Sequence, residues 1–142
     1  MLSPKFILGL LIFILSFHIL ATVNYWYQTY AWLDMSMHFL GGFWVALTAT
    51  ALISNFQFPI SNEILKQKFL SLFIVILSFV ALVGVLWEFF EFGYDVFIFS
   101  KGYSGALQQG VGDTMSDLFF DLLGGLAFLV IYKYLNTNHS RS

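Results

Sequence analysis

Hydrophobic residues fall into four long stretches separated by shorter, more polar segments. The stretches cover about residues 5–29, 34–54, 69–99 and 113–134. Each supplies the roughly 20 residues that a helix needs to cross about 30 Å of hydrocarbon. The pattern predicts an all-α integral membrane protein, a four-transmembrane-helix bundle that forms a single domain over residues 1–142.

The connecting segments differ in length and character. Only residues 30–33 separate the first two predicted helices, which makes these helices neighbours. Residues 55–68 are polar, and residues 100–112 contain four glycines, so both are expected to be loops. The aromatic run at residues 25–27 is typical of a membrane interface.

Composition supports a lipid environment. The chain of 142 residues is 59% hydrophobic and 10% charged, whereas a soluble domain of this size is about 25% charged. The lipid bilayer is therefore the first expected partner. A net charge of −2 argues against nucleic acid, which requires a basic surface. The absence of cysteine excludes disulfides and thiolate metal sites.

Charged residues divide between the two ends of the predicted bundle. Five of the six basic residues share one end: Lys5, Lys66, Lys68, Lys133 and Arg141. Seven of the eight acidic residues lie toward the other: Asp34, Glu88, Glu91, Asp95, Asp113, Asp117 and Asp121. The positive-inside rule then predicts a cell-membrane protein with both termini in the cytoplasm and the acidic end facing outward.

Polar residues recur at helical spacing on three of the predicted helices: Asp34 and His38 on the second, Glu88, Glu91 and Asp95 on the third, and Asp113, Asp117 and Asp121 on the fourth. Such spacing places each set along one helix face. At 1.5 Å per residue, His38, Glu88 and Asp117 lie at one level, about 24–28 Å from the inner boundary. We expect the three faces to meet in one outward-opening pocket.

Carboxylates beside an imidazole are a common ligand set for divalent metals. A buried carboxylate is costly, and the only basic residue expected nearby is Lys101, so the pocket requires protons or a cation. The candidate metal ligands are His38, Glu88, Glu91, Asp113, Asp117 and Asp121. Glu88 is alternatively a catalytic general base. The expected cofactor is a divalent ion, with Zn, Mn, Fe and Mg all left open.

Some of these residues also have a purely structural interpretation. His18 is expected to be a packed or hydrogen-bonded residue of the first helix. Asp34 and Asp113 stand at the starts of predicted helices, where a carboxylate caps free backbone N–H groups. Asp95 is alternatively a residue that reaches interfacial water. The paired glycines at 41–42 and 124–125 are typical of close helix packing.

Three segments resemble a known family: DMSMHFLGGF (34–43), WEFFEFGYD (87–95) and GDTMSDLFFDLLGG (112–125). They are similar to the YjdF-type predicted membrane proteins and, more distantly, to the VanZ-like family. The VanZ-like pattern places a His, a Glu and an Asp where this chain has His38, Glu88 and Asp117. Glu91 stands where that pattern has Gln, and Asp121 where it has Asn. The resemblance implies the same fold and a site at these positions.

Three functions are compatible with the sequence. The first is a metal-dependent hydrolase that acts on a lipid-like substrate at the outer leaflet, through water activated by the metal. The second is a small cation- or proton-coupled transporter, for which intramembrane carboxylates are typical. Four helices are few for alternating access, so a transporter implies a homodimer. The third is an interaction subunit with an acidic vestibule.

Overall fold

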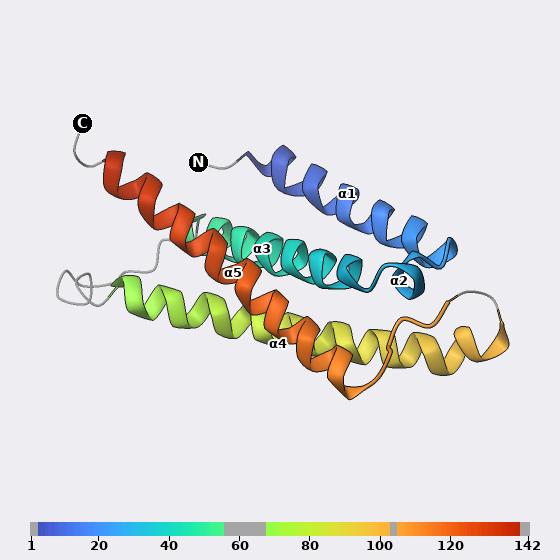
Figure 1. The fold of residues 1–142 in the computed structure, drawn as a ribbon. Coiled ribbons are helices and arrows are strands. Elements are labelled where there is room, and N and C mark those ends of the chain that lie inside the picture. Colours follow the sequence, from blue (N-terminus) through green and yellow to red (C-terminus); the bar gives the residue numbers. More distant parts are fainter. Residues whose placement is uncertain (1–2, 56–67, 103–104, 140–142) are drawn as a thin grey trace.

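The computed structural model describes residues 3–55, 68–102 and 105–139. Four long helices run alternately up and down: α1 (Pro4–Val23), α3 (Ala31–Asn55), α4 (Lys68–Phe97) and α5 (Val111–His139) (Figure 1). The short helix α2 (Trp26–Thr29) and the 3-10 turn η1 (Phe99–Lys101) complete the described elements. The start of α1 and the end of α5 lie at the same end of the bundle.

Four helices among the described residues are long and apolar enough to cross a membrane. Their candidate spans are Pro4–Val23, Ala31–Ser54, Leu70–Lys101 and Val111–Leu135. On α1, Leu8, Phe13 and Ile19 each expose more than half of their surface, as expected for lipid-facing side chains. The prediction of an all-α protein with four membrane spans is confirmed.

The connection between the first two long helices differs from the prediction. The sequence pattern places one helix over residues 5–29 and a turn at residues 30–33, but α1 ends at Val23 and α3 already begins at Ala31. Tyr25 has a left-handed backbone with φ of 58°, which interrupts the helix. The chain therefore turns at Asn24 and Tyr25, and α2 occupies the interval.

The other helix boundaries shift less. The predicted 69–99 helix is α4 with η1 after it, and α5 extends the predicted 113–134 helix at both ends. Most of the predicted 55–68 loop lies outside the described residues.

Helix α3 is at the centre of the bundle and packs against α1, α2, α4 and α5. Its closest neighbour is α5, because small residues let the two backbones approach. A Cβ atom at Gly42 would collide with the backbone of Asp121, and one at Gly124 with the carbonyl of Phe39. A buried apolar core lies in the C-terminal halves of α3 and α5 and the N-terminal half of α4. It includes Leu47, Ile76, Val80 and Leu129.

Candidate metal centre

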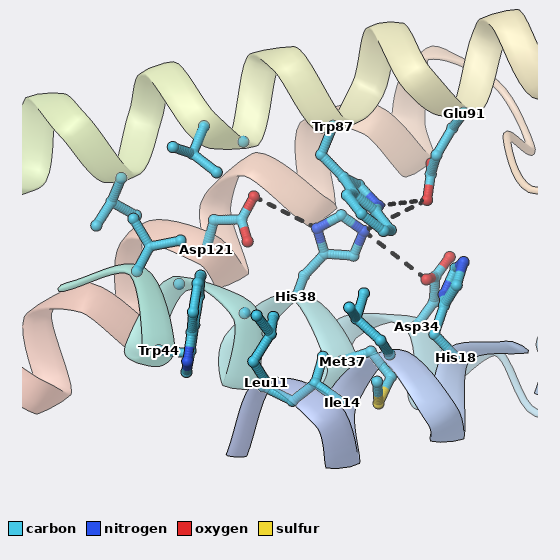
Figure 2. A pocket seen from close by; sticks show the side chains of 17 residues that line it. Leu11, Ile14, His18, Asp34, Met37, His38, Trp44, Trp87, Glu91 and Asp121 are labelled. Atoms are coloured by element: carbon cyan, nitrogen blue, oxygen red, sulfur yellow. Dashed lines mark hydrogen bonds and ion pairs between the residues drawn. The ribbon is translucent and has the colours of Figure 1, made fainter. Parts of the chain in front are cut away.

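His38 on α3 lies at the centre of a buried cluster of carboxylates (Figure 2). Its Nε2 atom is 3.8 Å from an oxygen of Asp34 and 3.9 Å from oxygens of both Glu91 and Asp117. On the other side of the ring, Nδ1 is 3.4 Å from Oδ2 of Asp121. One imidazole thus faces carboxylates from three helices.

Helix geometry explains why these side chains meet. Asp34 and His38 are four residues apart on α3 and therefore share one face. Glycine allows the other helices to approach that face closely. A Cβ at Gly42 would collide with the backbone at Asp121, and one at Gly84 on α4 would crowd the carboxylate of the same residue. The close packing of α3, α4 and α5 therefore brings Asp121 against the imidazole.

The cluster is shielded from its surroundings. Asp117 is 1% exposed and Glu91 is 2% exposed, and the other four members are each 6% exposed: Asp34, His38, Glu88 and Asp121. Several of their oxygen atoms accept no hydrogen bond: Oδ2 of Asp34, Oε1 of Glu88, Oε2 of Glu91 and both oxygens of Asp117. A buried carboxylate without a partner is strongly unfavourable. These oxygens call for a proton or a cation.

Two sets of three residues could hold a metal ion: Asp34, His38 and Asp117, and His38, Glu88 and Glu91. Within each set the ligand atoms lie within 4.8 Å of one another. Metal–ligand bonds of about 2.0–2.2 Å place two ligands of one ion up to about 4.4 Å apart. Small side-chain shifts would therefore bring either set to coordination distance.

Asp121 stands apart from both sets because it contacts the opposite nitrogen of His38. When its carboxylate accepts a hydrogen bond from Nδ1–H, the lone pair of the neutral imidazole lies on Nε2. That nitrogen faces Asp34, Glu91 and Asp117. Histidines that bind metals commonly make such a hydrogen bond through the other ring nitrogen. Asp121 is a predicted ligand, and its position in the structure also suits an orienting role.

Comparison with known proteins decides the family. The family described as "Predicted membrane protein (DUF2238)" matches residues 2–138. The chain belongs to this family. The match agrees with the YjdF-type resemblance of the sequence, whereas the VanZ-like resemblance stays a prediction. An "Uncharacterized protein" of Thermotoga maritima is 31% identical over 105 residues, which are 72% of this chain and 47% of the relative. The chain thus spans about half of that relative's length. No solved structure matches.

In this DUF2238 protein, neighbouring side chains fix one oxygen of each glutamate in the cluster. The indole N–H of Trp87 donates to Oε1 of Glu91 at 2.8 Å. The amide of Gln108 donates to Oε2 of Glu88 at 3.3 Å and contacts Thr114 at 3.2 Å. The second oxygen of each glutamate accepts no hydrogen bond. Each glutamate is therefore held in place with one oxygen left to bind a ligand.

Two acidic residues of the sequence pattern hold the connecting segment instead of joining the cluster. Asp95 accepts hydrogen bonds from the backbone N–H groups of Leu107 and Gln108, at 2.8 and 3.0 Å. Asp113, a predicted ligand, accepts one from the backbone N–H of Gln109 at 2.9 Å and lies outside both ligand sets. Leu107 and Gln108 are thereby attached to the C-terminal end of α4, and Gln109 to the N-terminal end of α5.

Asp34 is a member of one ligand set although it was not a predicted metal ligand. It lies in the first turn of α3, but the helix already begins at Ala31 and Oδ2 of Asp34 accepts no hydrogen bond, so its capping role stays a prediction. The side chain is buried in the cluster, with Oδ1 facing His38. Its i, i+4 spacing to His38 is the signal that links it to the site. Gln108 carries no such signal, because only the folded connection brings it to Glu88.

His18 is a hydrogen-bonded residue, in keeping with its structural interpretation. Its Nδ1 atom lies 2.9 Å from the hydroxyl of Tyr27, and its ring meets that of Trp87 edge-on at 5.2 Å between centroids. Burial raises the pKa of the Tyr27 phenol, and the charges of Asp34 and Glu91 add to that effect. Tyr27 therefore stays protonated beside the cluster.

Proposed function

We propose that this protein is a membrane-embedded enzyme that uses a divalent metal ion to hydrolyse an ester or phosphoester bond of a lipid. The observation that carries the proposal is the buried imidazole nitrogen of His38, which faces three carboxylates, together with the carboxylate oxygens that accept no hydrogen bond. A divalent cation would satisfy these oxygens in a region where water cannot.

The residues present fit such an ion. The proposed ligand set is Asp34, His38 and Asp117. Glu91 also lies near Nε2 of His38, at 3.9 Å. A mixture of one imidazole and carboxylates suits Zn, Mn, Fe or Mg. When bound, the ion would polarise an ester oxygen and lower the pKa of a water molecule.

The remaining residues would position groups and move protons. Asp121 holds the imidazole through Nδ1 and thereby directs Nε2 toward the ligands. Glu88 keeps one oxygen on Gln108 and has the other without a partner, so it is suited to accept a proton from water as a general base. Hydrolysis adds the hydroxyl group of water to the acyl or phosphoryl centre and its proton to the leaving oxygen.

The proposal includes an orientation in the membrane. Lys5 and Lys133 lie near the end of the bundle that holds the start of α1 and the end of α5. Lys101 and the acidic cluster lie toward the other end. The positive-inside rule supports a cell-membrane protein with both termini in the cytoplasm and a cluster near the outer leaflet.

Metal content is the first test. The protein is purified in mild detergent without a histidine tag, equilibrated with Zn, Mn, Fe(II) or Mg, and measured by plasma mass spectrometry. We expect near-stoichiometric metal in the wild type and a loss in Asp117→Asn. Asp113→Asn is the matched control, because it makes the same change on the same helix outside both ligand sets. We expect it to keep the metal.

Two results would overturn the metal proposal: a wild type without metal after supplementation, or equal metal loss in both variants. Metal-free protein would mean that protons hold the carboxylates. Proton or cation flux into liposomes would then become the decisive measurement, and flux abolished by Asp117→Asn would identify a transporter. Retained metal, by contrast, justifies a screen of lipid esters and phosphoesters for hydrolysis.

A further inference from the structure

A cavity of about 130 Å³ lies beside the cluster, between α1, α3 and α4 (Figure 2). Its lining is mostly apolar and includes Leu11, Ile14, Leu15, Met37, Val80 and Val83. The polar lining includes members of the cluster, His38, Glu91 and Asp121 among them, and also His18. The apolar space and the proposed metal centre are thus continuous.

Contacts at the aqueous end cover the cluster. Gln108 reaches Glu88, and the backbone of residues 107 and 108 is fastened to Asp95. The side-chain amide of Gln28 on α2 donates to the carbonyl of Ala106. These hydrogen bonds hold residues 105–108 over the cluster between α2, α4 and α5. A molecule that arrives from water meets this covering segment first.

The boundary between α1 and α4 is looser. In the described part of the chain, α1 packs its backbone against α2 and α3 but not against α4. The His18 and Trp87 rings bridge the two helices near the aqueous end of α1. Deeper in the span, the cavity lies between Leu11 and Ile14 of α1 and Val83 of α4. Leu15, which lines the cavity, is itself 41% exposed, so the lining reaches the surface of the bundle.

We propose that this cavity holds part of a fatty acyl chain of a bilayer glycerolipid, which enters sideways between α1 and α4 and places its ester group against the His38 cluster. The assignment rests on the proposed function for its chemical consequence, and it names the substrate class of that site. The apolar part of the lining supports it, because apolar cavities of about 150 Å³ take up small apolar molecules.

Charge favours an acyl ester over an isoprenyl phosphate. Five buried carboxylates surround the proposed metal site, and each one that stays ionised repels a terminal phosphate. A carboxylic ester is neutral and does not meet this repulsion. Its carbonyl oxygen is also a group that a cation in the cluster could polarise.

Photolabelling tests the assignment in the intact protein. The wild type is reconstituted in vesicles of phosphatidylethanolamine and phosphatidylglycerol with a phosphatidylcholine that carries a diazirine in the middle of one acyl chain. Labelled residues are then mapped by mass spectrometry. We expect labelling of the cavity residues Leu11, Ile14 and Val80, in addition to outward-facing residues such as Ile12 and Ile19.

Val83→Phe should fill the cavity and displace about two methylene groups, which lowers labelling of Leu11 and Val80 by about tenfold. Val85→Phe is the matched control, because Val85 is on the same helix, is 38% exposed and is not among the cavity residues. Ile14→Phe with Ile12→Phe as its control repeats the comparison from α1. Each variant is checked for its helical circular dichroism and for a single species in gel filtration.

Labelling confined to outward-facing residues, or unchanged in both Val83→Phe and Ile14→Phe, overturns the acyl-chain site. Cavity labelling by a photoreactive isoprenyl phosphate, with none by the phospholipid, also overturns it. Metal content is measured on the same preparations. Cavity labelling in a wild type that binds no metal supports the acyl-chain site and removes the metal-dependent function. Metal binding without cavity labelling supports the metal centre and overturns the acyl-chain site.

Discussion

The imidazole of His38 and the carboxylate of Asp121 face each other at 3.4 Å, although 83 residues separate them in the sequence. The contact fixes which ring nitrogen faces the other carboxylates. Because Nδ1 is engaged, Nε2 points toward Asp34, Glu91 and Asp117. Asp121 is thus a positioning residue in the proposed metal centre, even though it lies outside both ligand sets.

Asp121→Asn should weaken metal binding without abolishing it. The amide oxygen can still accept a hydrogen bond from Nδ1–H, but the negative charge that strengthens the histidine as a ligand is lost. Changes to such supporting partners cost about 10–100-fold in metal affinity. Competition with a calibrated chelator would measure the dissociation constant, with Asp113→Asn as the control. An unchanged constant in Asp121→Asn would show that this contact does not support a metal.

Asp117→Asn should stabilise the metal-free protein and remove most of the stabilisation that metal provides. In chelator, the change removes a buried carboxylate whose two oxygens have no hydrogen-bond partner. We expect the free energy of unfolding to rise by about 1–3 kcal/mol. With metal at 100 times its dissociation constant, the wild type gains about 2.7 kcal/mol, which the variant largely loses.

Thermal unfolding in detergent, with and without metal, measures both effects. Wild-type protein and Asp113→Asn should both be stabilised by metal. A variant that is less stable than the wild type in chelator would mean that Asp117 is held by a proton in a favourable contact. That outcome would favour a proton-coupled function over the metal-dependent one.

The membrane spans and the level of the cluster follow from the sequence because both depend on local periodicity. Runs of about 20 apolar residues specify spans, and a helical rise places His38, Glu88 and Asp117 at one depth. The break at Tyr25 was not predictable in this way. Tyr25 has a left-handed backbone, which is usual for glycine or asparagine but not for tyrosine, so its residue type does not indicate a break.

The roles of single residues depend on tertiary contacts, which the spacing of residues in the sequence does not determine. Asp34 and Asp113 both stand in the first turn of a helix, so the sequence cannot distinguish them. In the structure, Asp34 lies against His38, whereas Asp113 binds the backbone of Gln109. The difference comes from the path of residues 105–110, which irregular backbone and side-chain hydrogen bonds determine.

Gly42→Ala should destabilise the α3–α5 contact. The added Cβ atom would collide with the backbone of Asp121, which cannot move as a flexible side chain can. Overpacking of this kind costs about 1–3 kcal/mol. Gly9→Ala is the control, because a Cβ there has nothing within 4 Å. We expect Gly9→Ala to leave the melting temperature unchanged or to raise it. Equal melting temperatures for the two variants would contradict the close crossing of α3 and α5.

Asp95→Ala should release residues 107 and 108 from α4. The change removes the two hydrogen bonds that their backbone N–H groups donate to the carboxylate. Hydrogen bonds to charged groups contribute about 1.5–3 kcal/mol each. Hydrogen exchange, followed by mass spectrometry, should become faster at Leu107 and Gln108 and stay unchanged in the middle of α3. Exchange as slow as in the wild type would show that other contacts hold this segment.

Single cysteines should report the orientation of the bundle, because the natural chain has none. Ser3 and Ser100 are exposed and lie at opposite ends of the bundle. If the positive-inside rule holds here, a membrane-impermeant maleimide should modify Ser100→Cys in intact cells. It should reach Ser3→Cys only after permeabilisation. Modification of Ser3→Cys alone in intact cells would reverse the orientation, and the His38 cluster would then act on lipids of the cytoplasmic leaflet.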